Sequence, residues 1–415
     1  MTASQQTLAV RLANDLGYGA IKATYNGIRL KVPSVVAVER EQDFLQPLDF
    51  NQFADREAYM NHLLDHLDFS IQSNQVKMTQ RMLFGQAAVD SHLDLTSFDV
   101  NDMSGKAEQD LAVILTLGLL AGEGVKLQYQ QTHQFQTELT LKVTMATALP
   151  IVEGKMEQTV DAYRKRFLTG THIVTIHNFT DLITVHIKFE AVQVALEGET
   201  AQYQIANANQ VPQLAKDIQT DLVQHYPSMQ GIKPVDIYSI RNVLGIDIGE
   251  GTTDFIVFHD AAVNTQVSMS LAVGYGSALE DAILDLQAQR FNIKSRAELQ
   301  DFVHRPTNPM IQSKQQHVKQ IVARQLQTLS QKITSGMSKV LNRLGASGVD
   351  IIYVYGGGAI PLAQTLRPLL VAKTKAFNAG SDIPVIFIDA QYSQYLNEMG
   401  LDLILKYMEQ MIGLY

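Results

Sequence analysis

The sequence predicts an α/β protein made of two related halves. Its 415 residues exceed the length at which a single hydrophobic core normally stops growing, so two domains are expected. Apolar runs with strand character alternate with helical segments in both halves, which is the pattern of α/β domains. A turn motif of Asp, an apolar residue, Gly, any residue and Gly occurs in each half. Such an internal repeat indicates duplicated domains.

Composition limits the kind of partner that the chain can bind. Hydrophobic residues make up 46% and charged residues 18%, which indicates a soluble folded protein rather than a disordered or coiled-coil chain. The formal net charge of −9 argues against direct, non-specific DNA binding, which needs clustered Lys and Arg. Local basic patches are compatible with this balance. Any nucleic-acid partner is expected to be reached through an adaptor protein.

The chain contains no cysteine, so disulfides, thiolate nucleophiles and Cys-based zinc sites are excluded. A cytoplasmic location is therefore expected. Residues 1–9 do not combine a basic segment with an apolar core, so no secretory signal is expected. The longest apolar run, Leu111–Ala121, has about half the length of a membrane span, and no membrane association is expected.

The first half is expected to form domain I over residues 1–210, completed by a C-terminal helix at 393–415. Polar sequence between about 39 and 101 indicates a smaller, looser inserted subdomain. The other predicted elements are, in order, strands at Leu8–Leu12 and Ile28–Val32, a helix at Asp110–Ala121 closed by Gly122 and Gly124, a strand at Leu139–Leu149, a helix at Glu153–Phe167 and a hairpin at His172–Val194.

The second half is expected to form domain II over residues 211–392, with a helical insertion at about 280–345. The other predicted elements are, in order, a helix at Pro212–His225, a hairpin at Leu244–Phe258, a strand at Val267–Val273, a helix from Ala278, a buried strand at Val349–Tyr355, a short helix at Pro361–Val371, a strand at Pro384–Ile388 and a terminal helix at Gln394–Met411.

The repeated motif lies in a hairpin in each half. Asp15–Lys22 and Asp247–Asp254 each follow one apolar strand and precede another. Glycines let such a turn expose backbone N–H groups to an anion. Two turns from duplicated domains would grip a polyphosphate from opposite sides, with Asp15 and Asp247 holding water molecules of a hydrated magnesium ion. Lys22 would then neutralise phosphate charge. Two unrelated hairpins are the alternative.

Three glycines, Gly356–Gly358, follow the strand that ends at Tyr355. Without side chains, the backbone can lie flat against a planar group such as a purine or its sugar. The next residues, Ala359–Leu362, can begin a helix whose N-terminus favours phosphate. A plain strand-to-helix turn is the alternative, although such a turn rarely needs three glycines.

The two Asp-x-Gly turns, the triple glycine and their order resemble the actin-like ATPase superfamily, which also contains heat-shock chaperones and sugar kinases. Within it, the chain looks most like the plasmid-segregation actins of the ParM type. Asn14–Lys22 resembles their first phosphate motif, Gly245–Asp254 their second and Val354–Ala359 their adenosine motif. Thr147–Pro150 and Leu396–Gly400 resemble two further motifs of the family. The resemblance covers nearly the whole chain.

The resemblance implies an actin-like fold that binds ATP, or GTP, with Mg²⁺ in a cleft between its two domains. It also implies that Asp15 and Asp247 serve the magnesium and the attacking water. The residues around the phosphates would be Gly17, Tyr18, Gly19, Lys22, Gly249, Glu250, Gly251, Thr252 and Thr253, and those along the adenosine would be Gly356, Gly357 and Gly358.

Two positions depart from the family pattern. The water-orienting acid of the family best matches Glu197, but Leu196 stands where these proteins often carry Pro. A solvated loop carboxylate beside Glu199 is the alternative interpretation of Glu197. Glu250 stands where Gly is frequent, and its charge close to phosphate is tolerable only if it faces magnesium or solvent.

The resemblance implies an ATPase that polymerises head to tail and moves plasmid copies apart through a small DNA-binding adaptor. Hydrolysis needs only positioned water and charge stabilisation, which agrees with the lack of a dedicated nucleophile. One alternative is a sugar-type kinase of the same fold, although no obvious catalytic base follows the first motif. Another is a nucleotide-switched scaffold of the MreB type, for which Met1–Val10 is too polar to serve as a membrane-binding end.

Overall fold

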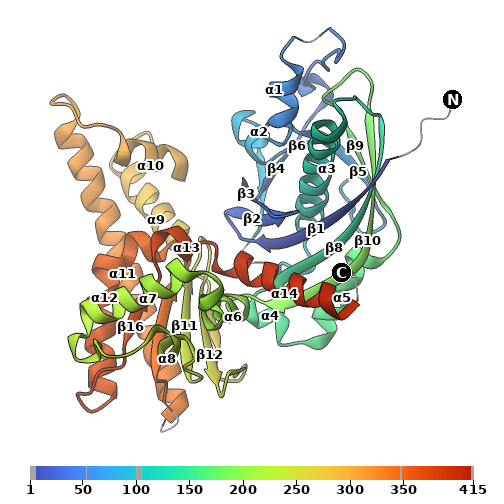
Figure 1. Ribbon diagram of the computed structural model, residues 1–415. Coiled ribbons are helices and arrows are strands. Elements are labelled where there is room, and N and C mark those ends of the chain that lie inside the picture. The colour runs from blue at the N-terminus through green and yellow to red at the C-terminus, as the bar shows by residue number, and fades with distance from the viewer. Residues whose placement is uncertain (1–5, 53, 100–101, 103–104, 346–347, 413–415) are drawn as a thin grey trace. The chain divides into compact units, whose positions relative to one another are not determined.

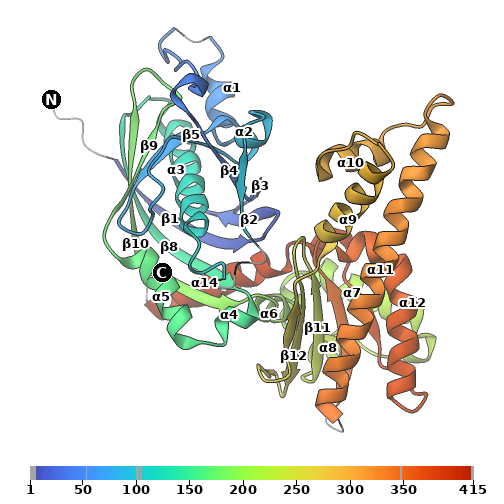
Figure 2. The ribbon, with the colours of Figure 1, turned by 180° about the vertical axis from the view of Figure 1, so that it is seen from behind.

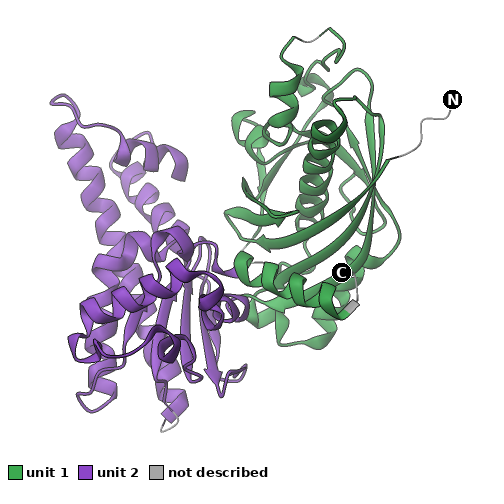
Figure 3. Ribbon diagram, viewed as in Figure 1, with its two compact units in different colours: residues 1–197, 398–415 green, residues 198–397 purple. Residues whose placement is uncertain are grey.

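The computed structural model describes residues 6–52, 54–99, 102, 105–345 and 348–412 (Figure 1). The chain forms two compact units, shown in two colours in Figure 3: unit 1 comprises residues 1–197 and 398–415, and unit 2 comprises residues 198–397. The division thus precedes α6 (Glu199–Ala206), whereas the sequence placed the domain boundary after residue 210. Each unit combines a sheet with helices, which confirms the predicted α/β class.

Unit 1 is built on one ten-stranded sheet. Three long strands run parallel at its centre, and their alternating apolar side chains enter one hydrophobic core. The central strands end together, at residues 16, 149 and 196. From edge to edge the order is β3 (Ile28–Pro33), β2 (Ala20–Tyr25), β1 (Gln6–Leu16), β8 (Glu138–Leu149), β10 (Ile183–Leu196), β9 (His172–Ile176), β5 (Asp68–Gln72), β6 (Met82–Phe84), β4 (Val35–Val38) and β7 (Leu95–Ser97).

The region between about 39 and 101, predicted as a smaller and looser inserted subdomain, continues this sheet. β5 pairs with β9, and β6, β4 and β7 extend the sheet beyond β5. Two short helices, α1 (Arg56–Asn61) and α2 (Gly85–Asp90), complete the region. Its buried Phe69 and Phe84 belong to the same core as the central strands. Strands this short carry too little periodicity to be recognised from sequence.

The main helix of unit 1, α3 (Asp110–Thr132), continues past its predicted end at Ala121. A Cβ atom at Gly122 would lie 2.8 Å from Leu64 Cδ1, and one at Gly124 would lie 2.8 Å from Leu141 Cδ1. The two glycines therefore permit close packing inside the helix and do not end it. The helix ends at His133, which adopts the left-handed conformation with φ of 52°.

Three further helices complete unit 1. The helix predicted at Glu153–Phe167 is two helices, α4 (Ile151–Gly154) and α5 (Glu157–Leu168). The terminal helix α14 (Leu396–Ile412) places Leu401 and Leu405 against alanines of the sheet, namely Ala13, Ala146 and Ala148. These small side chains let the helix approach the strands closely.

Unit 2 contains a six-stranded sheet. Its parallel strands are β11 (Val243–Ile248), β15 (Ile351–Tyr355) and β16 (Val385–Phe387). The antiparallel strand β12 (Thr253–His259) pairs with β11 and also with the short strands β13 (Ala262–Val263) and β14 (Met269–Leu271). Buried Ile246, Phe255 and Val354 contribute to a core between this sheet and the helices.

The helices of unit 2 include the predicted helical insertion. The long helix α11 (Gln312–Leu344) packs along α12 (Ala359–Phe377) and α9 (Tyr275–Ala288) (Figures 1 and 2). α12 continues to Phe377, past its predicted end at Val371, with Pro368 inside it. The helices other than α6 are α7 (Pro212–His225), α8 (Pro234–Tyr238), α9 (Tyr275–Ala288), α10 (Arg296–His304), α11 (Gln312–Leu344), α12 (Ala359–Phe377) and α13 (Ala390–Ser393). None of the helices that the structure describes is long and apolar enough to cross a membrane.

A buried charge cluster in unit 1 links stability to pH. Arg81 Nε donates a hydrogen bond to Asp68 Oδ1 at 2.7 Å and lies 3.4 Å from Glu39 Oε2. Burial, followed by the neighbouring charge of Asp68, raises the pKa of Glu39 to about 8. Because an unfolded glutamate titrates near pH 4.3, the native state binds more protons than the unfolded chain between about pH 4 and pH 8.

We therefore expect the free energy of unfolding to fall as the pH rises through this range, by up to about 1.4 kcal/mol per pH unit from this group. Glu39→Gln should flatten the slope because an amide does not titrate. Urea unfolding between about pH 5 and pH 8 measures the slope, and Glu41→Gln, at an exposed position, is the matched control. A slope in Glu39→Gln as steep as that of the unmodified chain would contradict the assignment.

Candidate functional site

The first predicted turn joins β1 to β2 in unit 1. Asp15 lies opposite Lys22 in the hairpin, with Lys22 Nζ 3.4 Å from Asp15 Oδ2. A Cβ atom at Gly17 would lie 2.7 Å from the Ala20 carbonyl oxygen, so the tight turn needs glycine there. Ser34 Oγ donates a hydrogen bond to the Gly17 carbonyl at 2.7 Å. The turn thus presents a buried carboxylate and an ammonium group side by side.

A lysine that the sequence gave no reason to select, Lys106, completes this end of unit 1. Its side chain is fully buried, and Nζ donates to the Leu16 carbonyl and to Glu197 Oε1, each at 2.7 Å. Nζ also lies 4.7 Å from the centre of the Tyr18 ring. Burial alone would lower the pKa of Lys106, but the charge and hydrogen bond of Glu197, together with the charges of Tyr18 and Asp15, outweigh burial and raise the pKa. Lys106 is therefore a permanently charged anchor.

Glu197 follows β10, at the common end of the three parallel strands. Its backbone N–H donates to the Leu149 carbonyl at 2.8 Å, and its side chain is 13% exposed. The alternative of a fully solvated loop carboxylate is therefore wrong. The negative charges of both Glu197 and Asp15 raise the pKa of Lys106, so all three groups belong to one charged cluster. The structure thus brings the predicted acids Asp15 and Glu197 to the same end of the sheet.

The second predicted turn joins β11 to β12 in unit 2. Asp247 lies at the end of β11, and Asn397 Nδ2 donates a hydrogen bond to its Oδ2 at 2.7 Å. Asn397 Oδ1 in turn accepts from the Gly198 N–H at 2.9 Å and from Thr200 Oγ1 at 2.8 Å. These partners fix the orientation of the amide. Asn397 therefore orients the Asp247 carboxylate.

The triple glycine lies against the end of β11. Gly356 has φ of 93°, and a Cβ atom there would lie 2.4 Å from the Ile248 carbonyl oxygen and 2.5 Å from Asp247 Oδ1. The Gly358 N–H donates to the same Ile248 carbonyl at 2.8 Å. A backbone without side chains is needed for this approach. The structure thus brings the second turn and the triple glycine together.

Gly356→Ala is expected to damage this part of unit 2, because the new methyl group would both strain the backbone and displace Asp247. We expect a loss of about 1–3 kcal/mol in the free energy of unfolding, together with weaker nucleotide binding. Urea unfolding and titration with a fluorescent ATP analogue measure the two effects. Gly357→Ala is the control, since only Gln394 Cβ lies within 4.0 Å of its added methyl. Equal effects of both substitutions would contradict the prediction.

Three predicted phosphate contacts have side chains that bond to other protein groups. Thr253 is fully buried, and its hydroxyl donates to the Val273 carbonyl at 2.8 Å, so only its backbone remains for a phosphate. Glu250 Oε1 accepts from Arg296 Nη1 at 2.9 Å. Its charge is thus offset by an arginine of α10, an arrangement that the sequence did not suggest. Thr252 Oγ1 donates to Asp254 Oδ2 at 3.0 Å, within the turn.

Of the remaining predicted positions, Tyr18 and Gly19 lie in the first turn, Gly249 and Gly251 lie in the second turn, and Gly357 belongs to the triple glycine. The N-terminus of α9 adjoins the second turn as well. Its Tyr275 N–H donates to the Gly249 carbonyl at 2.9 Å, and its Gly276 N–H donates to the Glu250 carbonyl at 2.8 Å. In unit 2, three segments distant in sequence therefore surround the end of β11.

Asp15 and Asp247 were predicted to serve a magnesium ion. No group of three or more potential metal ligands occurs among the residues that the structure describes. A single carboxylate fits Mg²⁺ that keeps most of its water shell, as this ion prefers to do. The donor set therefore fits a hydrated Mg²⁺ bound with a phosphate ligand rather than a cage made by protein alone.

Two family models match the chain. Residues 13–199 match the N-terminal domain of actin-like proteins, and residues 245–368 match the C-terminal domain of the archaeal MreB-like actin homologue. The chain belongs to the actin-like ATPase superfamily. In this actin-like protein, the first model ends just beyond Glu197, and the second begins at Gly245 and includes the triple glycine. No curated protein matches the chain.

Solved structures show the same fold. The structure of the actin-like protein Alp7A is similar over 98% of both chains, with a TM-score of 0.66 and 16% identity. Bacillus thuringiensis ParM, solved with ATP, covers 97% of this chain and 99% of its own, with a TM-score of 0.58 and 16% identity. The archaeal actin homologue Ta0583 covers 96% and 99%, with a TM-score of 0.58 and 14% identity. These similarities confirm the actin-like fold.

Proposed function

We propose that this actin-like protein binds ATP with Mg²⁺ through both hairpin turns, hydrolyses it and polymerises into dynamic filaments. The observation that carries the proposal is the pair of glycine-containing turns. At each turn, a strand ends close to a carboxylate that a neighbouring side chain contacts. Asp15 is held beside Lys22, and Asp247 is held by Asn397. Backbone N–H groups and oriented charges of this kind suit a polyphosphate.

Each residue of the proposed site has its own role. Asp15 and Asp247 would hold Mg²⁺ through water, and bound Mg²⁺ would supply neutralisation of phosphate charge. Glu197, fixed by Lys106, orients the attacking water. Lys22 offsets negative charge beside Asp15. The triple glycine admits the adenosine close to the backbone.

Solved structures of similar proteins support the proposed nucleotide and the proposed self-assembly. Bacillus thuringiensis ParM has been solved with ATP, with ADP and with AMPPNP. A relative of the same fold is described as a non-polymerisable mutant of pCBH ParM, which implies that the unmutated protein polymerises. We extend the ParM likeness to plasmid segregation in the cytoplasm through a small DNA-binding adaptor. GTP is the alternative nucleotide.

Phosphate release by the purified chain tests the proposed activity. We expect release with ATP and Mg²⁺ alone, loss of release when magnesium is chelated, and a comparison with GTP to set the nucleotide preference. A sugar-type kinase would instead produce ADP only after a sugar is added. Dependence on an added sugar would therefore replace the proposal with the kinase alternative, and lack of hydrolysis with any nucleotide would leave a nucleotide-switched scaffold.

A further inference from the structure

Positive charge is concentrated on α11 of unit 2. Between Asp301 and Asp350 the sequence contains no Asp or Glu, although the chain as a whole has 42 acidic and 33 basic residues. Six basic side chains of this stretch are exposed on α11, namely Lys314, Lys319, Arg324, Lys332, Lys339 and Arg343. An acidic protein thus exposes one basic helix.

Part of this helix borders a groove of about 490 Å³ beside β14, which we name the basic groove. Lys332 and Lys339 line it, and because they are seven residues apart they lie on one face of the helix. Thr328, Gln331 and Ser335 lie between and beside them. Neither lysine has a carboxylate partner among the residues that the structure describes. The groove therefore offers two uncompensated ammonium groups with neutral hydrogen-bonding neighbours.

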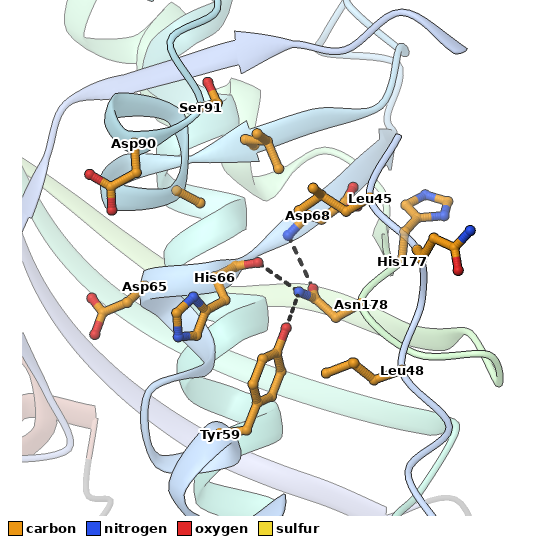
Figure 4. A pocket seen from close by; sticks show the side chains of 13 residues that line it. Leu45, Leu48, Tyr59, Asp65, His66, Asp68, Asp90, Ser91, His177 and Asn178 are labelled. Carbon is orange, nitrogen blue, oxygen red and sulfur yellow. Dashed lines mark hydrogen bonds between the residues drawn. The ribbon is translucent and has the colours of Figure 1, made fainter. Parts of the chain in front are cut away.

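The inserted region of unit 1 carries the opposite charge. Residues 39–101 include eleven Asp or Glu and only four Lys or Arg. This region contains a pocket of about 450 Å³, which we name the acidic pocket (Figure 4). Asp65, Asp68 and Asp90 line it together with apolar side chains, among them Leu45 and Leu48, and its described lining includes no Lys or Arg.

Two of these carboxylates, Asp65 and Asp90, can meet a charged group of a partner at the pocket. Asp68 is neutralised by Arg81, which donates to both of its oxygens. Asp65 and Asp90 are exposed, and their nearest polar partners are His62 at 3.2 Å and the neutral amide of Gln86 at 2.7 Å. The leucines beside them suit the aliphatic stem of a lysine or arginine whose charged end meets the carboxylates.

The pocket wall is fixed by hydrogen bonds rather than formed by loose side chains. Asn178 Nδ2 donates to Tyr59 Oη at 2.9 Å and to the His66 carbonyl at 2.6 Å, while its Oδ1 accepts from the Asp68 N–H at 3.1 Å (Figure 4). A preorganised pocket spends little conformational entropy when a partner enters.

We propose that the acidic pocket of one molecule binds the basic groove of a second copy of this chain. Charge complementarity selects this partner, because the chain itself carries an acidic region that matches the basic helix. DNA is disfavoured because the net charge of −9 repels phosphates. Two different surfaces on one chain make a heterologous contact, which generates open assemblies. The inference rests on and deepens the proposed filament function, but the contact itself does not require hydrolysis.

Two charge-reversal variants of the full chain test the contact. Lys332→Glu with Lys339→Glu reverses the basic groove, and Asp65→Lys with Asp90→Lys reverses the acidic pocket. Either variant alone brings like charges together, so we expect the concentration for half-maximal assembly to rise at least about tenfold in sedimentation velocity. In an equimolar mixture, the reversed groove of one variant meets the reversed pocket of the other with swapped charges, and the two unmodified surfaces meet as a native pair. Assembly should therefore return to within about threefold of that of the unmodified chain.

Lys373→Glu and Asp181→Lys reverse exposed charges elsewhere and serve as matched controls. Higher salt should weaken assembly of the unmodified chain. The contact is overturned if either reversal variant assembles like the unmodified chain, if the mixture of folded variants does not recover, or if the unmodified chain stays monomeric at every concentration.

Two further outcomes would replace the partner. Loss of DNA binding in the groove variant with unchanged assembly would assign the groove to nucleic acid. A change in sedimentation of the reversal variants that does not depend on protein concentration would place the contact within a single chain. Phosphate release from dilute monomers is measured in parallel. Recovery of the mixture without hydrolysis would overturn the proposed ATPase alone, whereas hydrolysis without recovery would overturn this contact alone.

Discussion

Replacement of Asp247 by alanine is expected to slow ATP hydrolysis at least about a hundredfold without unfolding unit 2. The carboxylate is held by Asn397 at 2.7 Å and lies close to the Gly356 backbone, so it is oriented before any ligand binds. A preorganised charge needs no rearrangement during the reaction, so its removal is expected to lower the rate of ATP hydrolysis. Phosphate release at saturating ATP measures the effect, with Asp236→Ala, exposed on α8, as the matched control.

Asn397→Ala separates orientation from charge. This variant keeps the Asp247 carboxylate but removes the amide that orients it, so we expect an intermediate loss of about tenfold in rate. Assembly with ATP should persist at least partly in Asp247→Ala, because hydrolysis follows binding. Unchanged phosphate release in Asp247→Ala would contradict the role assigned to this residue.

Lys106→Met is expected to cost about 3–5 kcal/mol in the free energy of unfolding, because it leaves the Glu197 carboxylate without its buried partner. The Leu16 carbonyl would also lose its hydrogen bond from Nζ. Hydrolysis should fall as well, since Glu197 would no longer be held in place. Urea unfolding and phosphate release measure the two losses separately.

The double variant Lys106→Met with Glu197→Gln distinguishes the two roles. Removing both charges should recover most of the stability, because no uncompensated charge remains. Hydrolysis should stay low, because the acid that orients water is gone. If the double variant were as unstable as Lys106→Met, the loss would come from packing around the lysine stem. If it hydrolysed ATP normally, Glu197 would have no role in the reaction.

The features that the sequence predicted well are local ones. The glycines at 17 and 356 are required by a close approach or a positive φ, and such needs are visible in a short motif. Lys106 was missed, and Asn397 was noticed only within the Leu396–Gly400 motif, without its partner; the two residues act on partners 91 and 150 positions away. Neither stands in a motif whose spacing reveals that partner, so only the fold brings each pair together.

The errors in the predicted elements have a related cause. Glycine inside a helix was taken as its end, whereas Gly122 and Gly124 serve contacts with Leu64 and Leu141 that come from distant segments. The charge of Glu250 near phosphate was predicted to be tolerable only if it faces magnesium or solvent, and the structure adds Arg296 of α10 as a partner that offsets this charge. In each case, a contact with a distant segment gives the residue a role that its neighbours in the sequence do not indicate.

Sedimentation of the unmodified chain with ATP and Mg²⁺ over a wide range of concentrations, with phosphate release followed in the same samples, tests whether the protein forms ATP-dependent filaments. We expect assembly above a threshold concentration, release of phosphate after assembly, and disassembly once ATP is exhausted. Monomers at every concentration, or hydrolysis that never accompanies assembly, would contradict the proposed coupling of ATP hydrolysis to filament assembly.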